Sequence, residues 1–282
     1  MPNIRKSLRE SRLRRWLLLI AAVITVFFAW LVFSPAPEGI LILEYHMVST
    51  TDDEDSRPYN VPPDEFRQHL DYLREQGYTA ITLQDFMRAR KGKQELPAKP
   101  VILTFDDGYE DNYTTLLPIL EEYGIRANVF MVTNMIGREG YLTWDELRDM
   151  QNRGIEIGSH TADHLPLPNL PADVQEKEVH LSKLLLEWNG IKTVFHFSYP
   201  NGAYTKELPG LLHDTEYLSG VTGDAGINTM ETDPYLLQRV NIPHPHFGLT
   251  EFKLRLWKAE ILTKMDWKQH RIDPSQPPPP QE

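Results

Sequence analysis

Apolar residues form one long run near the start of the chain and short runs at intervals after it. The long run, WLLLIAAVITVFFAWLVF, covers residues 16–33 without a charge, close to the length that an α-helix needs to cross a bilayer core. Six basic residues and one acidic residue precede it in the segment 1–15, and positive flanks stay in the cytoplasm. The pattern predicts a single-pass anchor in the cell membrane, with residues 1–15 cytoplasmic and the rest of the chain exported.

A cleaved signal peptide is the alternative interpretation of this apolar run. Signal-peptide cleavage follows small residues in an A-x-A-like pattern, whereas the nearest small residues here are Ser34 and Ala36, followed by Pro37. This context favours an uncleaved anchor at residues 16–33 and a linker at residues 34–38.

Downstream of the linker, short apolar runs alternate with amphipathic stretches. The runs predict strands, and apolar residues spaced three and four apart between them predict helices. We expect strands at 40–45, 101–105, 127–132, 155–158 and 194–199, and helices at 63–76, 83–90, 112–123, 143–152 and 172–188. Thr143 and Glu146 fit a capping box, and Gly124 and Gly154 stand where left-handed helix ends are expected.

This alternation predicts an α/β fold with a parallel sheet. A (β/α) barrel and a doubly wound sheet both fit, and we favour a barrel that is distorted or incomplete. The domain is expected at residues 39–270. Residues 271–282 contain the proline-rich PSQPPPPQE, which has too few apolar residues to pack and is predicted to be disordered.

Composition narrows the chemistry that this domain can perform. The 282 residues include no cysteine, which excludes disulfides, thiolate metal ligands and cysteine nucleophiles. After residue 15 the chain keeps 23 of its 29 basic residues and 39 of its 40 acidic residues, a net charge of −16. Such a surface repels polyanions and argues against a nucleic-acid partner. A neutral or cationic partner and a merely solvated acidic surface both remain open.

Two adjacent carboxylates follow the second predicted strand. Asp106 and Asp107 stand in TFDDGY, directly after the apolar residues 101–103, and Gly108 permits a sharp turn there. The carboxyl ends of barrel strands form the active-site face. Because adjacent carboxylates raise each other's pKa, a metal bound by one would leave the other as a base. The alternative is that one aspartate caps the next helix while the other is solvated.

Two histidines follow the next-but-one strand. His160 and His164 lie in GSHTADH after the apolar residues 155–157. At i and i+4 two imidazoles reach the same side of a helical turn and can share a cation. Alone, such a pair is as readily solvated or buried in a core. Together with Asp107 it forms an open three-ligand site with room for a catalytic water.

A third motif ends the last predicted strand, in FSYPNG. Pro200 and Gly202 predict a tight turn whose backbone N–H groups can face the cleft and stabilise an oxyanion, with a plain turn as the alternative. Taken in order, TFDDGY, SHTADH and SYPNG resemble the first three motifs of polysaccharide deacetylases, carbohydrate esterase family 4. The resemblance covers residues 40–250.

The resemblance implies a distorted (β/α) barrel and a divalent metal, most often zinc in this family. By the same resemblance Asp107, His160 and His164 are the metal ligands and Asp106 is the catalytic base. The backbone N–H of Asn201 is the expected oxyanion donor. The reaction would release acetate from an acetamide and leave a glucosamine amine.

The third motif departs from the usual family pattern. Ser198 stands where an arginine is usual, and Asn201 stands where an aromatic residue is usual. The Tyr-Pro-x-Gly form resembles the branch that deacetylates exported poly-N-acetylglucosamine, in which an arginine from a later Asp-Pro motif orients the base. Arg239, in the segment 233–239, is therefore the expected partner of Asp106, with a surface arginine as the alternative.

The expected catalytic acid has no matching motif. His244 and His246 lie in the right part of the chain but in a proline-broken context, IPHPHF. Either is a candidate acid, and an exposed loop is the alternative. His46 follows the first strand and is interpreted as a structural, hydrogen-bonded histidine. Tyr109, Tyr199 and Tyr204 are candidates for stacking on sugar rings, with core or rim positions as the alternative.

These predictions describe a metal-dependent enzyme that removes N-acetyl groups from an extracytoplasmic polysaccharide. The resemblance favours poly-N-acetylglucosamine over peptidoglycan. An O-acetyl esterase with the same site, or a silent glycan-binding protein with the same fold, are the competing functions. The silent protein would have lost Asp106 or a metal ligand, and the sequence retains all of them. The sequence does not determine the oligomeric state.

Overall fold

The computed structural model describes residues 2–35, 37–51, 53–192 and 194–265. The chain divides into two compact units, Met1–Pro37 and Glu38–Glu282. The first unit holds helix α1 (Pro2–Phe33), whose stretch Arg14–Leu31 is long and apolar enough to cross a membrane. This stretch overlaps the predicted anchor. The tail predicted to be disordered lies outside the described residues.

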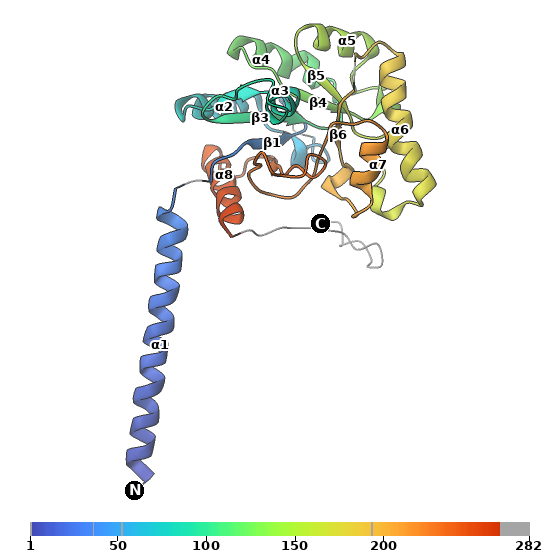
Figure 1. Ribbon diagram of the computed structural model, residues 1–282. Coiled ribbons are helices and arrows are strands. Elements are labelled where there is room, and N and C mark those ends of the chain that lie inside the picture. Colours follow the sequence, from blue (N-terminus) through green and yellow to red (C-terminus); the bar gives the residue numbers. More distant parts are fainter. Residues whose placement is uncertain (1, 36, 52, 193, 266–282) are drawn as a thin grey trace. The chain divides into compact units, whose positions relative to one another are not determined.

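The second unit is built on a curled parallel sheet (Figure 1). The strands pair in the order β7-β6-β5-β4-β3-β1-β8, and β2 joins the first half of β3 beside β4. Their bounds are β1 Leu41–Tyr45, β2 Thr79–Ile81, β3 Pro100–Phe105, β4 Asn128–Met131, β5 Glu156–Ser159, β6 His196–Ser198, β7 Ser219–Val221 and β8 Val240–Asn241. The predicted α/β class with a parallel sheet is confirmed.

The two ends of the sheet approach each other through one short segment. Leu237 forms a parallel bridge with Val221 at the end of β7, and three residues later Val240 in β8 pairs with Leu43 of β1. The sheet therefore curls into a barrel whose last strand is irregular. This is the distorted barrel predicted from the sequence.

Helices α2, α4, α5 and α6 lie on the outside of this sheet (Figure 1). Their bounds, with α3 and the later helices, are α2 Pro63–Glu75, α3 Leu83–Arg90, α4 Leu117–Tyr123, α5 Trp144–Asn152, α6 Ala172–Trp188, α7 Leu208–Asp214 and α8 Leu249–Lys264. Thr143 caps α5 with the expected capping box, and Gly124 ends α4 at a φ of 65°. The predicted helix 112–123 starts as a π-helix at Asn112–Leu116.

Alternation along the strands separates two apolar clusters. In β1, Leu41 and Leu43 face the cluster shared with the outer helices, whereas Ile40 and Ile42 face a second cluster that includes α3. Because side chains alternate along a strand, Glu44 shares the face of Ile42. Thr104 and Asp106 share the face of Ile102 by the same rule. The inner face is thus apolar along the strands and polar at their carboxyl ends.

Candidate active site

The candidate site lies at the carboxyl ends of the strands, the end that carries the loops of a (β/α) barrel. A cavity of about 220 Å³ opens there. It is lined by Glu44, His46, Tyr59, Asp106, Asp107, Tyr109, Val132, Met135, Tyr141, His160, His164 and Asn201. Residues at or just after the ends of β1, β3, β5 and β6 therefore meet at one place, although Glu44 and Asn201 are 157 positions apart along the chain.

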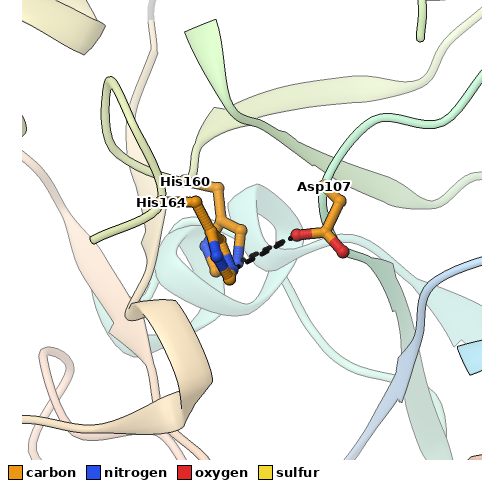
Figure 2. A group of neighbouring side chains, drawn as sticks. All are labelled: Asp107, His160 and His164. Atoms are coloured by element: carbon orange, nitrogen blue, oxygen red, sulfur yellow. Dashed lines mark ion pairs between the residues drawn. The ribbon is translucent and has the colours of Figure 1, made fainter. Parts of the chain in front are cut away.

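Asp107, His160 and His164 converge on one point of this cavity (Figure 2). The Oδ1 atom of Asp107 lies 3.5 Å from Nε2 of His160 and 3.4 Å from Nε2 of His164. Ligand bonds of about 2.0–2.2 Å in a tetrahedral zinc site place ligand atoms roughly 3.3–3.6 Å apart. Three groups at these separations fit one divalent cation and leave a position open for water.

Each ligand of this cluster is oriented by its own loop. Asp107 and Gly108 have φ values of 73° and 77°, which turn the chain sharply after β3. A Cβ on Gly108 would lie 2.0 Å from Sδ of Met131, so only glycine fits there. His160 is buried, and its Nδ1 lies 2.8 Å from the carbonyl oxygen of Ser198. Donation from Nδ1 to that carbonyl leaves Nε2 free to bind a metal.

The segment between the two histidines is a loop, which corrects the predicted helical turn. Thr161 and His164 have positive φ values of 67° and 57°, and no helix is assigned to residues 160–164. The buried carboxylate of Glu178 in α6 accepts the backbone N–H groups of Ala162 and Asp163, at 3.0 Å and 2.9 Å. These bonds to α6 hold the backbone in place of helical hydrogen bonds. The two imidazoles therefore meet because the loop folds back, and a helical turn is not required.

Asp106 lies beside the metal cluster in a closed network. Both of its oxygens accept bonds from the guanidinium of Arg239, at 2.8 Å each, and the hydroxyl of Ser198 donates to Oδ2 at 2.9 Å. All three side chains are buried. Burial by itself would raise the pKa of Asp106, but the positive charge of Arg239 and the hydrogen bonds that its guanidinium donates hold this pKa far below its usual range. Asp106 is therefore ionised.

Ser198 and Arg239 contact each other and both contact Asp106. Ser198 occupies the position where an arginine is usual in the third motif, and the guanidinium of Arg239 reaches its hydroxyl at 3.1 Å. The Nε atom of Arg239 donates to the carbonyl of Thr222 at 3.0 Å. Arg239 thus reaches Asp106 from the irregular last strand of the barrel.

Glu44 is a site residue that the sequence interpretation missed. Its Oε2 lies 3.4 Å from Nε of Arg239, and its carboxylate lines the cavity near His46 and Asp106. Burial raises the pKa of Glu44 to about 7, against the lowering effect of Arg239. Strand alternation was the available signal, because Glu44 ends β1 on the inner face.

Aromatic rings form two sides of the cavity. Tyr109 and Tyr141 stack at a centroid distance of 5.3 Å, and Tyr59 packs on the ring of His46 at the same distance. Tyr59 is 50% exposed, so its free face is available to a ligand. Of these tyrosines the sequence interpretation singled out Tyr109 alone.

Tyr199 and Tyr204 do not have the position expected of sugar-stacking residues. Both are buried, and neither lines the cavity. The hydroxyl of Tyr199 donates to the carbonyl of Tyr235, and that of Tyr204 donates to Asp224. A ring buried in the core offers no face to a sugar, so this placement removes both tyrosines from the substrate-binding set.

The candidate histidines also separate by position. His46 lines the cavity, whereas His244 and His246 are absent from its described lining. The Nδ1 atom of His244 lies 2.9 Å from the carbonyl of Asn60, and His246 is exposed. Asn201 does line the cavity, in a left-handed turn with a φ of 56°.

The fold and this cluster define a (β/α)-barrel protein with a candidate hydrolytic metal site. The family model of polysaccharide deacetylases matches residues 93–219. The Bacillus subtilis protein YxkH, which is named for the same family, is 34% identical over 73% of this chain and 72% of its own length. The chain belongs to the polysaccharide deacetylase family.

Two further similarities extend across the domain. The poly-beta-1,6-N-acetyl-D-glucosamine N-deacetylase of Staphylococcus epidermidis is 24% identical over 73% of this chain and 80% of its own length. The structure of the Streptococcus pyogenes deacetylase PplD in complex with acetate matches with a TM-score of 0.70 and 28% identity, covering 77% of this chain and 98% of the other. The predicted family, barrel fold and hydrolase class, which acts on N-acetyl amide bonds of polysaccharides, are confirmed.

Proposed function

We propose that this chain is a metal-dependent N-deacetylase of an extracytoplasmic polysaccharide built from N-acetylglucosamine, with poly-N-acetylglucosamine as the favoured polymer. The observation that carries the proposal is the meeting of two unlike groups in one cavity. Asp107, His160 and His164 converge as a candidate cation site, and the buried carboxylate of Asp106 lies beside them with Oδ2 3.8 Å from Nε2 of His160.

Asp107, His160 and His164 would hold the metal, and zinc suits two imidazoles and one carboxylate. When bound, it would acidify a water and polarise the acetamide carbonyl. Asp106, ionised beside Arg239, accepts the proton of the attacking water. The backbone N–H of Asn201, on the cavity wall, donates to the oxyanion as the carbonyl carbon becomes tetrahedral.

The leaving amine needs a proton donor, and we assign this role to His46. Among the described residues that line the cavity, His46 is the one histidine outside the metal set. It lies close to Asp106 and Glu44. His46 would protonate the amine as the carbon–nitrogen bond breaks, which releases acetate and a glucosamine unit.

The walls of the cavity suit a neutral sugar. Tyr59 on one side and the stacked Tyr109 and Tyr141 on another offer apolar rings to the faces of pyranose units. The relative from Staphylococcus epidermidis is named for poly-β-1,6-N-acetylglucosamine, and the sequence form Tyr-Pro-x-Gly points the same way. Both support this polymer over peptidoglycan.

We also propose that α1 anchors the chain in the cell membrane, with its N-terminus in the cytoplasm and the barrel outside. The apolar stretch Arg14–Leu31 supports the span, and the basic residues before it support the orientation. A polymer outside the cell would then meet the enzyme at the membrane surface.

Acetate release from β-1,6- and β-1,4-linked N-acetylglucosamine oligomers, and from an O-acetylated glycan, tests the function. We expect release from the β-1,6 oligomers, loss of activity with a chelator, and recovery when zinc is added back. Preferential release from the O-acetylated glycan would make the protein an esterase. No release from any of them, with metal bound, would contradict the proposed activity and favour a binding role.

A further inference from the structure

Helix α8 has one apolar face in the protein and another in solvent. Phe252, Leu256 and Ala259 are buried, and the ring of Phe252 stacks on His69 of α2 at a centroid distance of 4.0 Å. These residues, spaced four and three apart, anchor the helix on α2 and β8. The inner face alone therefore accounts for the position of α8 in the fold.

The outer face of α8 carries a second apolar stripe. Leu254 and Trp257 are 55% and 49% exposed, and Met265, just past the end of the helix, is also exposed. With the half-buried Ile261 they are spaced three, four and four apart, so all four lie on one side of the helix. A row of four apolar side chains along one side of a helix exceeds the scattered exposure that is normal for a surface, so this row is a candidate contact surface.

The charge of α8 is opposite to that of the rest of the domain. The helix has four basic residues, Lys253, Arg255, Lys258 and Lys264, against the two acidic residues Glu251 and Glu260, whereas the chain after residue 15 has a net charge of −16. Helix α6 also exposes a leucine and a tryptophan, Leu181 and Trp188. It carries four acidic and two basic residues. Exposed apolar side chains combined with lysines are typical of helices that lie in a membrane interface.

The chain leading from α1 into the domain enters beside α8. Ile40 forms an antiparallel bridge with Asn228, and the backbone N–H of the neighbouring Ile227 donates to the Thr263 hydroxyl in the last turn of α8. Ile40 lies seven positions after Phe33, the end of α1, and seven steps of extended chain span at most about 25 Å. If α1 crosses the membrane, this end of the domain stays near the lipid surface.

We propose that the outer face of α8, formed by Leu254, Trp257, Ile261 and Met265 with the flanking lysines, docks on the anionic surface of the same membrane. Trp257 would lie at headgroup depth and the lysines would contact lipid phosphates. The contact rests on the proposed membrane anchor and adds a second attachment to it, which would fix the orientation of the barrel on the membrane.

A label on α8, compared with one on α6, tests this docking. The chain has no native cysteine, so Leu254→Cys and Leu181→Cys each give a single site on an exposed leucine of a helix. The full chain is labelled with a fluorophore and placed in nanodiscs of phosphatidylcholine and phosphatidylglycerol that contain doxyl-labelled lipid. We expect the doxyl lipid to quench the label at position 254 and to leave the label at position 181 unquenched.

Adding Trp257→Ser and Lys258→Glu to the Leu254→Cys chain should remove the quenching, because both residues are exposed and their loss leaves the inner face of α8 unchanged. A label on Ala22→Cys reports on α1 separately. Quenching at position 22 with equal quenching at 254 and 181 would overturn the docking and leave the anchor intact. No quenching at position 22 would refute the anchor, and the docking with it.

Discussion

Asp106 and Asp107 are neighbours in the chain, and their surroundings differ in almost every respect. Asp106 is 1% exposed and bound by Arg239 and Ser198, and Arg239 keeps its pKa far below the usual range. Asp107 faces two imidazoles across gaps of 3.4 Å and 3.5 Å, and burial raises its pKa to about 6. Asp106 is paired with a buried arginine, whereas the ion pairs of Asp107 are with the two histidines.

The contrast indicates that the two adjacent carboxylates have different roles, one as a base and the other as a metal ligand. A group whose counter-charge is a buried arginine is held in one place and stays ionised, as a positioned base requires. A group beside neutral imidazoles needs a cation from outside the chain, as a metal ligand does. The left-handed turn at Asp107 and Gly108 allows the two side chains to point to different partners.

Removing a ligand from the open cluster, which is the metal-site group Asp107, His160 and His164, should reduce activity more than any other change. In His160→Ala the metal loses one of three protein ligands, and since Lewis-acid assistance is worth several kcal/mol, kcat/KM should fall by about 10³-fold or more. Metal content after dialysis and acetate release measure both consequences. His196→Ala is the matched control, because His196 is equally buried but lies outside the cavity. Full metal content in His160→Ala would contradict the assignment.

Replacing Asp106 in the closed network, which is the group Asp106, Ser198 and Arg239, should remove the base and leave metal binding unchanged. For Asp106→Asn we expect kcat to fall by about 10²–10⁴-fold, the usual range for general-base catalysis, with metal content unchanged. Asp85→Asn is the control, since Asp85 is a buried aspartate that pairs with Arg126 at 2.6 Å, away from the cavity. If Asp106→Asn lost its metal and kept its turnover per bound metal, the two carboxylates would have the opposite roles.

The open cluster was easier to predict from the sequence than the closed network. Asp107 lies in TFDDGY, and His160 and His164 lie in SHTADH. Each is a short motif of metal-ligand residue types that directly follows a predicted strand, so it can be recognised in the sequence. The pairing of Arg239 with Asp106 is indicated by the family resemblance alone, because no local pattern in the sequence links two residues that are 133 positions apart.

Much of the helical and strand pattern was predicted, but the shortest strands and the last two helices were not. Strands β1 and β3 to β6 lie where the apolar runs are. The missed β2, β7 and β8 have three, three and two residues, too short for a hydrophobic period. His46 and Glu44 were missed as site residues for a different reason, because their function depends on where the barrel curls. Tyr199 and Tyr204 were singled out by residue type, and burial by tertiary packing decided against them.

Weakening the closed network without removing its charge sharpens the comparison. A lysine in Arg239→Lys keeps the charge but cannot bond both oxygens of Asp106. We expect a loss of about 10–100-fold in kcat, with KM and metal content nearly unchanged. Arg126→Lys, in a half-exposed ion pair with Asp85, should change activity little. A lysine variant with full kcat would show that Arg239 contributes charge alone and that its two-point contact is dispensable.

The smallest effect should come from Tyr59, which contacts neither carboxylate network and lines only the wall of the cavity. Tyr59→Ala removes a stacking surface worth about 0.5–1.5 kcal/mol, so KM for an oligomer should rise about 2- to 13-fold while kcat and metal content stay constant. Tyr59→Phe should restore KM, because the ring provides the contact. A fall in kcat without a change in KM would instead place Tyr59 in the chemistry, through the imidazole of His46 on which it packs.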